Sequence, residues 1–165
     1  MGCDVKKIIL AGLLALLPLA SVADQWVMHE KKDEMRGAST YIAELRSKNT
    51  IELSSPHEGE VKLVIMMVSQ DAKNILGTAL ILNNGRLVCQ SINRCIISAK
   101  FDDGPVKEFS VSPVGSSGNA LSISDFHSFA KDLNSSNKVF IEVPVYREGA
   151  AQFKFSPEPL AFDSK

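Results

Sequence analysis

The 165-residue sequence has little of the chemistry from which active sites are usually built. It contains three histidines, three cysteines and one tryptophan, and its formal net charge at pH 7 is only −1. Nucleic-acid binding relies on a basic surface, so this charge balance predicts no DNA or RNA partner. The few histidines also leave little from which to build a hydrolase site, which needs a base beside its nucleophile.

The sequence also lacks an apolar run of the roughly 20 residues that a membrane-spanning helix needs. Its main apolar run covers residues 8–20, comes directly after two lysines, and is followed by the small residues Ser21 and Ala23. That order is typical of a secretory signal peptide. We therefore predict a signal peptide over residues 1–23, cleavage near Ala23, and a periplasmic or secreted protein without a stable membrane anchor.

Removal of the signal peptide leaves two of the three cysteines. A lipoprotein carries its cysteine at the end of the apolar run, whereas Cys3 stands before it and is removed with the signal. Cys89 and Cys95 reach a compartment that oxidises thiols, so we predict a disulfide between them. Their spacing matches neither a redox motif nor a structural zinc site. We accordingly expect no metal and no cofactor.

Residues 24–165 are long enough to form one domain with its own hydrophobic core. Alternating apolar and polar residues, or short β-branched runs between turn residues, predict strands along much of this length. The predicted strands cover residues 26–31, 39–47, 49–53, 59–69, 79–82, 86–88, 95–101, 106–111 and 139–143, with a last one after residue 149. A helix remains an alternative for residues 41–46, which are good helix formers.

Three local signals carry further expectations. Residues 63–67 are apolar on both faces, which predicts a strand in the middle of a sheet. Asn84-Gly85 between apolar strand residues predicts a tight hairpin, whose primed turn needs positive φ at both central positions. Pro144 predicts an edge strand or a bulge, because proline cannot donate to a strand ladder.

One helix is predicted, near residues 124–134, after a loop over residues 112–120. Ser124 can cap its N-terminus. The apolar residues of the segment fall on one helical face: Phe126, Phe129, Ala130 and Leu133. The predicted class is mainly β (α+β): an antiparallel sandwich or open barrel of about eight short strands, with the helix covering an edge or end.

Histidine catalysis is not predicted. None of the three histidines, His29, His57 and His127, stands in a nucleophile motif, and Gly-Ser-Ser-Gly at 115–118 lacks the strand–serine–helix arrangement of a hydrolase elbow. We expect His127 to point into solvent from the helix.

Asp102 and Asp103, with Glu108 nearby, have two interpretations. They could be paired carboxylates or calcium ligands, but a calcium loop spaces its oxygens at alternating positions around a glycine, and this segment does not. Turn residues before Gly104-Pro105 are the favoured interpretation.

Residues 30–36 form a charged run of mixed sign between two predicted strands. Such a run is usually a solvated turn. The alternative is the rim of a protein-binding surface anchored by Met35 and Arg36, because both residue types are enriched in interfaces.

A larger pattern runs over almost the whole exported part. It consists of Trp26, Asp33-Glu34-Met35-Arg36-Gly37, Asn49-Thr50, Pro56, Gly59, Cys89, Cys95, Phe101-Asp102-Asp103-Gly104-Pro105, Tyr146, Gly149, Phe153 and Phe155. It resembles a broad group of small exported β-rich proteins of Gram-negative bacteria and their mobile elements, a group without an established activity. The resemblance implies a single exported domain and names no reaction.

These observations favour a non-enzymatic binding or inhibitor-like module of the periplasm that acts through an envelope protein or a ligand. A rigid sheet would present its loops to that partner, with the affinity set by a few aromatic or arginine anchors. Two other function classes stay open: an accessory component of an envelope secretion or conjugation apparatus, and a hydrolase.

Overall fold

The computed structural model describes residues 25–55, 58–89, 95–160 and 162. These residues form eleven strands and one helix. In chain order the elements are β1 (Val27–Asp33), β2 (Ala38–Arg46), β3 (Ile51–Leu53), β4 (Gly59–Val61), β5 (Leu63–Ser69), β6 (Ile75–Leu82), β7 (Ile96–Phe101), β8 (Val106–Pro113), β9 (Ala120–Ile123), α1 (Phe126–Asn134), β10 (Val139–Val145) and β11 (Gly149–Phe155). The mainly β class with a late helix is confirmed.

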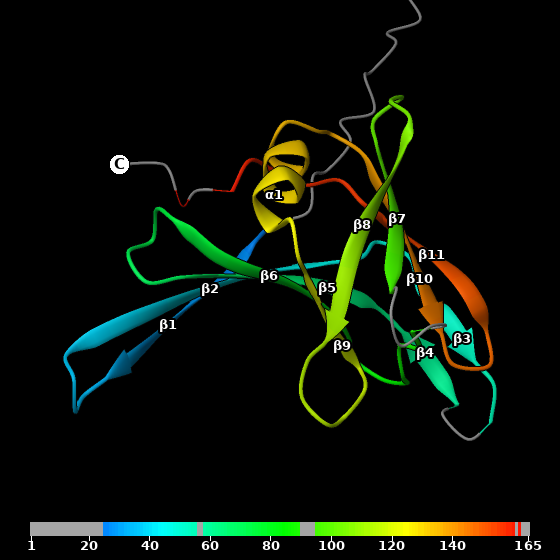
Figure 1. Ribbon diagram of the computed structural model, residues 1–165, viewed down its shortest axis with the longest axis horizontal. Coiled ribbons are helices and arrows are strands. Elements are labelled where there is room, and N and C mark those ends of the chain that lie inside the picture. The colour runs from blue at the N-terminus through cyan, green and yellow to red at the C-terminus, as the bar shows by residue number, and fades with distance from the viewer. Residues whose placement is uncertain (1–24, 56–57, 90–94, 161, 163–165) are drawn as a thin grey trace, which may run out of the picture.

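Nine of the strands form one antiparallel sheet, in the order β1-β2-β5-β6-β9-β8-β7-β10-β11, while β3 and β4 pair separately. In Figure 1, β1, β2, β5 and β6 run across the view and β7 and β8 stand upright, with α1 beside β8. The edge strands β1 and β11 do not pair with each other in the described part of the chain. The sheet is therefore curved and antiparallel, but it is not a closed barrel.

More strands are present than the sequence predicts. The run expected to be one strand over residues 59–69 is divided at Lys62, where the chain leaves the small sheet as β4 and enters the large one as β5. The sequence did not predict β9 at all, because its four residues are too few to show a clear alternation.

The core follows from the alternation of side chains along each strand. Inward residues from both halves of the large sheet are fully buried in one cluster, including Leu45, Leu63, Ile65, Met67, Leu80, Leu82, Ile141, Val143 and Phe153. The helix closes this cluster with Phe129. Its ring packs edge-to-face against Phe101 and Phe109, at centroid distances of 5.8 and 5.3 Å.

The helix begins after Asp125 rather than after Ser124, so the predicted cap is wrong by one residue. The backbone N–H of Ser124 still bonds to the carbonyl of Ser110, as part of the sheet. The carboxylate of Asp125 instead accepts the N–H of Ser128 at 3.2 Å, which satisfies a free amide of the first turn. Phe129 and Leu133 are buried on the predicted face.

The central position of β5 is confirmed, since it lies between β2 and β6. Its inward residues are fully buried. Val64, Met66 and Val68 on the other face are only half-buried, so the strand is not covered on both sides as expected.

The predicted hairpin at Asn84-Gly85 is wrong. Gly85 has a φ of +85°, but Asn84 does not adopt positive φ, so no primed turn forms. Both edges of β6 are already taken, by β5 and β9. Leu87 instead forms a bridge with Val145. Glycine still suits position 85, because φ there is positive and a Cβ would lie 2.6 Å from Leu53 Cδ1, so the leucine side chain would have to move.

Pro144 does not mark an edge strand, because β10 pairs with both β7 and β11. The ladder with β7 ends at the pair Glu142 and Ser98, so the missing N–H of the proline removes no bond from it. The proline carbonyl accepts the N–H of Val88 at 2.9 Å. Proline is tolerated here because the neighbouring strand has already ended.

The predicted signal peptide, residues 1–23, lies outside the described residues, as does His57. Among the helices of the described part, none has both the length and the apolar character needed to cross a bilayer.

Candidate binding surfaces

The strands β1 and β2 form a hairpin that projects from the rest of the sheet (Figure 1). Its register runs from the pair Val27 and Glu44 to the pair Asp33 and Ala38. This pairing excludes the helical alternative for residues 41–46. Gly37, at φ +66°, lets the chain turn back, and its N–H donates to the Asp33 carbonyl at 2.7 Å.

The carboxylate of Asp33 holds the tip of this hairpin together. One oxygen accepts the backbone N–H groups of Met35 and Arg36, at 3.0 and 3.1 Å, and the other accepts from the Arg36 guanidinium at 3.0 Å. The side-chain bond from Arg36, followed by its backbone bond, lowers the pKa of Asp33 below its ordinary value. Because the pKa of folded Asp33 is lowered, the carboxylate stays charged and keeps these bonds at pH values above the ordinary pKa of an aspartate. The bonds are lost only as the pH falls through the lowered pKa.

Met35 is the most exposed of the large apolar side chains in the described part, at 87%. It lies at the tip between the two strands, next to Arg36, so the structure brings the two candidate partner-binding residues together. The arginine side chain is engaged by Asp33, which fixes its direction. Val27 and Met28, each 46% exposed, add apolar surface on β1.

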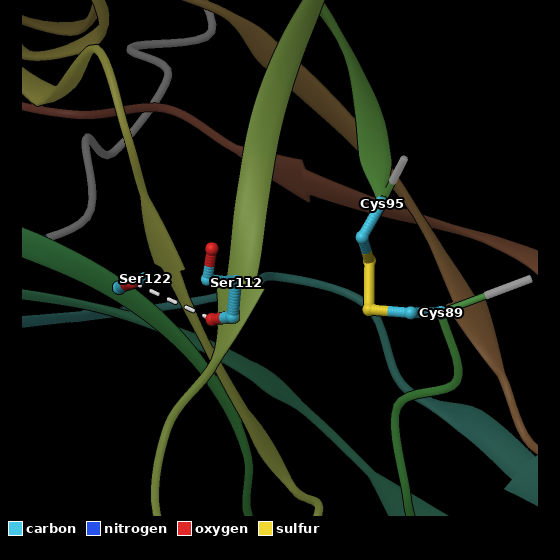
Figure 2. Close-up of a disulfide and its surroundings, with 4 residues drawn as sticks. All are labelled: Cys89, Cys95, Ser112 and Ser122. Atoms are coloured by element: carbon cyan, nitrogen blue, oxygen red, sulfur yellow. Dashed lines mark hydrogen bonds between the residues drawn. A yellow bond between two sulfur atoms is a disulfide. The ribbon is translucent and has the colours of Figure 1, made fainter. Parts of the chain in front are cut away.

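The predicted disulfide is present: Cys89 and Cys95 are bonded, with an S–S distance of 2.07 Å. Figure 2 shows the bond beside β8, near the point where Ser122 Oγ donates to the Ser112 carbonyl at 3.4 Å. Both cysteines are half-buried and pack against the core. The bond fastens the segment after Leu87 to the start of β7.

The two described histidines lie on different elements. His29 is exposed on β1, and His127 is exposed on α1, as expected, where its ring lies 4.2 Å from the ring of Phe126. Across the described ranges, no three His, Cys, Asp or Glu side chains are grouped so that they could hold a metal ion.

Asp102 has a structural task that the sequence did not reveal. It occupies the turn predicted before Gly104-Pro105, with a φ of +47°. Its carboxylate accepts the backbone N–H groups of Asn137 and Lys138, at 3.0 and 2.9 Å, just before β10 begins. The Asp102 carboxylate therefore links the turn after β7 to the segment before β10. Asp103 and Glu108, in contrast, are exposed.

We expect Asp102→Ala to lower the free energy of unfolding by about 1.5–3 kcal/mol, the usual cost of losing hydrogen bonds to a charged group. Alanine also tolerates positive φ less well than aspartate does. Asp102→Asn should cost less, because it keeps an acceptor oxygen. Urea unfolding curves measure the difference, with the exposed neighbour Asp103→Ala as control. Equal midpoints for the two alanine variants would contradict this role.

A second surface, which sequence reasoning missed, lies on the outer face of β7, β10 and β11. Phe140 is half-buried there, directly opposite Lys100 on one side and Lys154 on the other. The ammonium groups of Lys138 and Lys154 lie 5.0 and 6.0 Å from the centre of its ring. We call these four residues the Phe140 site. The only part of the site that is visible in the local sequence is Lys-x-Phe at 138–140, because the other two lysines come from distant strands.

A cavity of about 360 Å³ adjoins the Phe140 site. Its lining combines residues of four strands: Ser98, Ala99, Lys100, Val106, Phe140, Glu142 and Gln152. The Gln152 amide donates to the Glu142 carboxylate at 2.8 Å, which fixes both side chains on the cavity wall. Such a mixture of apolar and polar lining residues is usual in a small-ligand site.

No protein-family model matches the chain, and no curated protein or solved structure matches it either. The resemblance to exported β-rich proteins remains a prediction from the sequence pattern.

Proposed function

We propose that this chain is a non-enzymatic binding module of the periplasm that docks a protein partner through the tip of the β1–β2 hairpin. The observation that carries the proposal is Met35, 87% exposed at the end of a projecting hairpin. A partner that covers this side chain removes apolar surface from water, which favours binding.

The geometry of the tip supports a docking role. Asp33 fixes the turn through three hydrogen bonds, so little conformational entropy would be lost when a partner binds. Methionine adapts its shape to a partner surface, and the arginine beside it supplies directed donors. Together they provide one apolar and one charged anchor.

A compartment outside the cytoplasm fits the covalent chemistry of the chain. A disulfide between Cys89 and Cys95 persists where thiols are oxidised. The apolar run at residues 8–20 and the small residues after it have the order of a cleaved signal. Both features support a periplasmic site of action.

We expect Met35→Ala to reduce capture of the partner from a periplasmic extract about tenfold, equivalent to roughly 1.4 kcal/mol, as for an interface anchor. Leu76→Ala is the matched control, because Leu76 is also exposed, at 51%, but lies on β6 away from the tip. Immobilised wild-type and variant proteins are compared by quantitative mass spectrometry of what they retain. The proposal fails if the Met35 and Leu76 variants retain the same proteins in the same amounts.

A further inference from the structure

The Phe140 site gathers three positively charged side chains on one face of the sheet. Lys100, Lys138 and Lys154 make no ion pair with a described carboxylate. Lys107, on the neighbouring strand β8, is different, since its ammonium lies 2.7 Å from Asp132. Lys107 therefore has a structural ion-pair partner, whereas the three lysines of the Phe140 site have none among the described carboxylates.

Two ammonium groups beside one ring, with a third lysine paired opposite it, are not explained by stability alone. A cation over an aromatic ring is favourable, and two of the lysines have that contact. Lys100 and Lys154 lie opposite Phe140 on the two strands that flank β10, each about 5 Å from it, so the three lysines concentrate positive charge on this face. An added anion would be attracted to this charge, which indicates a binding role.

We propose that the Phe140 site binds a small ligand in which an oxyanion, a phosphate or a carboxylate, is attached to a planar ring. The lysines would hold the oxyanion, and the ring would lie against Phe140 over the adjoining cavity. This site is separate from the hairpin tip, so its existence does not depend on the proposed partner.

The cavity wall limits what the ligand can be. Glu142, on the same face of β10 two residues from Phe140, is a second charged group of the cavity and has the sign opposite to the lysines. A ligand with a second anionic group at that end would be repelled. We therefore expect one oxyanion at the lysine end and a neutral or donor group toward Glu142 and Gln152.

Calorimetric titration of the purified protein tests the site with simple probes. Phenyl phosphate and benzoate represent the two oxyanions on a ring, inorganic phosphate lacks the ring, and phenol lacks the charge. We expect at least one of the two ring oxyanions to bind, and to bind about tenfold more tightly than inorganic phosphate or phenol. The tighter of the two identifies the oxyanion. If neither binds, the proposal is overturned.

Variants assign the binding to this surface. Lys100→Gln combined with Lys154→Gln should weaken the ring oxyanion about tenfold, as expected for the loss of charge-assisted bonds. Phe140→Leu should weaken the ring oxyanion but leave inorganic phosphate unchanged. The control is Lys73→Gln combined with Lys131→Gln, two exposed lysines in the loop before β6 and on α1. Equal affinity in the Lys100/Lys154 and control variants would overturn the assignment, and circular dichroism checks that all variants are folded.

Discussion

Phe129→Ala is expected to lower the free energy of unfolding by about 3–5 kcal/mol, the range measured for removal of a buried aromatic ring. Phe129 is fully buried in α1. Its ring is the only helical member of a triad with Phe101 and Phe109, and both edge-to-face contacts would be lost together. A cavity would then open between the helix and the strands β7 and β8.

Thermal and urea unfolding followed by circular dichroism measure this loss. Lys131→Ala, an exposed position on the same helix, is the matched control and should change the stability by less than about 0.5 kcal/mol. A loss of similar size in both variants would mean that helix propensity, rather than the aromatic triad, governs the stability of this region.

Replacement of both Cys89 and Cys95 by serine should cost about 2–3 kcal/mol, because the short loop between them restricts the unfolded chain only modestly. The folded state adds a second reason for a loss. Backbone bonds between Val88 N–H and the Pro144 carbonyl, and between Tyr146 N–H and the Arg86 carbonyl, hold the segment before Cys89 to β10, and the disulfide adds its link to the start of β7.

The same loss should appear when the wild-type protein is unfolded in the presence of a thiol reductant. The double serine variant, by contrast, should be insensitive to the reductant, and this serves as the control. If reduction leaves the wild-type midpoint unchanged, the disulfide contributes nothing to stability and the segment is held by its backbone bonds alone.

The positions of most strands could be predicted because alternation is a local property of the sequence. The strands β5, β7 and β8 were located in this way, and the buried face of α1 was identified. The hairpin at Asn84-Gly85 failed because the local signal describes only the turn. Both edges of β6 pair with other strands, β5 and β9, which are more than fifty residues apart in the sequence.

The candidate sites divide in the same way. Met35 and Arg36 could be named from the sequence, since a charged run between two adjacent strands marks a hairpin tip whatever the rest of the fold does. The Phe140 site could not, because its lysines come from β7, the segment before β10, and β11, and only the strand register places them around one ring.

By itself, the sequence determined the β-rich class, the late helix, the disulfide pairing and the exposed hairpin tip. Each of these depends on periodicity, turn residues or spacing within a short stretch of chain. Only the tertiary structure decided that Leu87 pairs with Val145, that Asp102 binds the segment before β10, and that Lys100, Lys138 and Lys154 gather on the face that carries Phe140. These depend on which distant strands become neighbours, and that choice is made by the burial of the whole core rather than by any one segment.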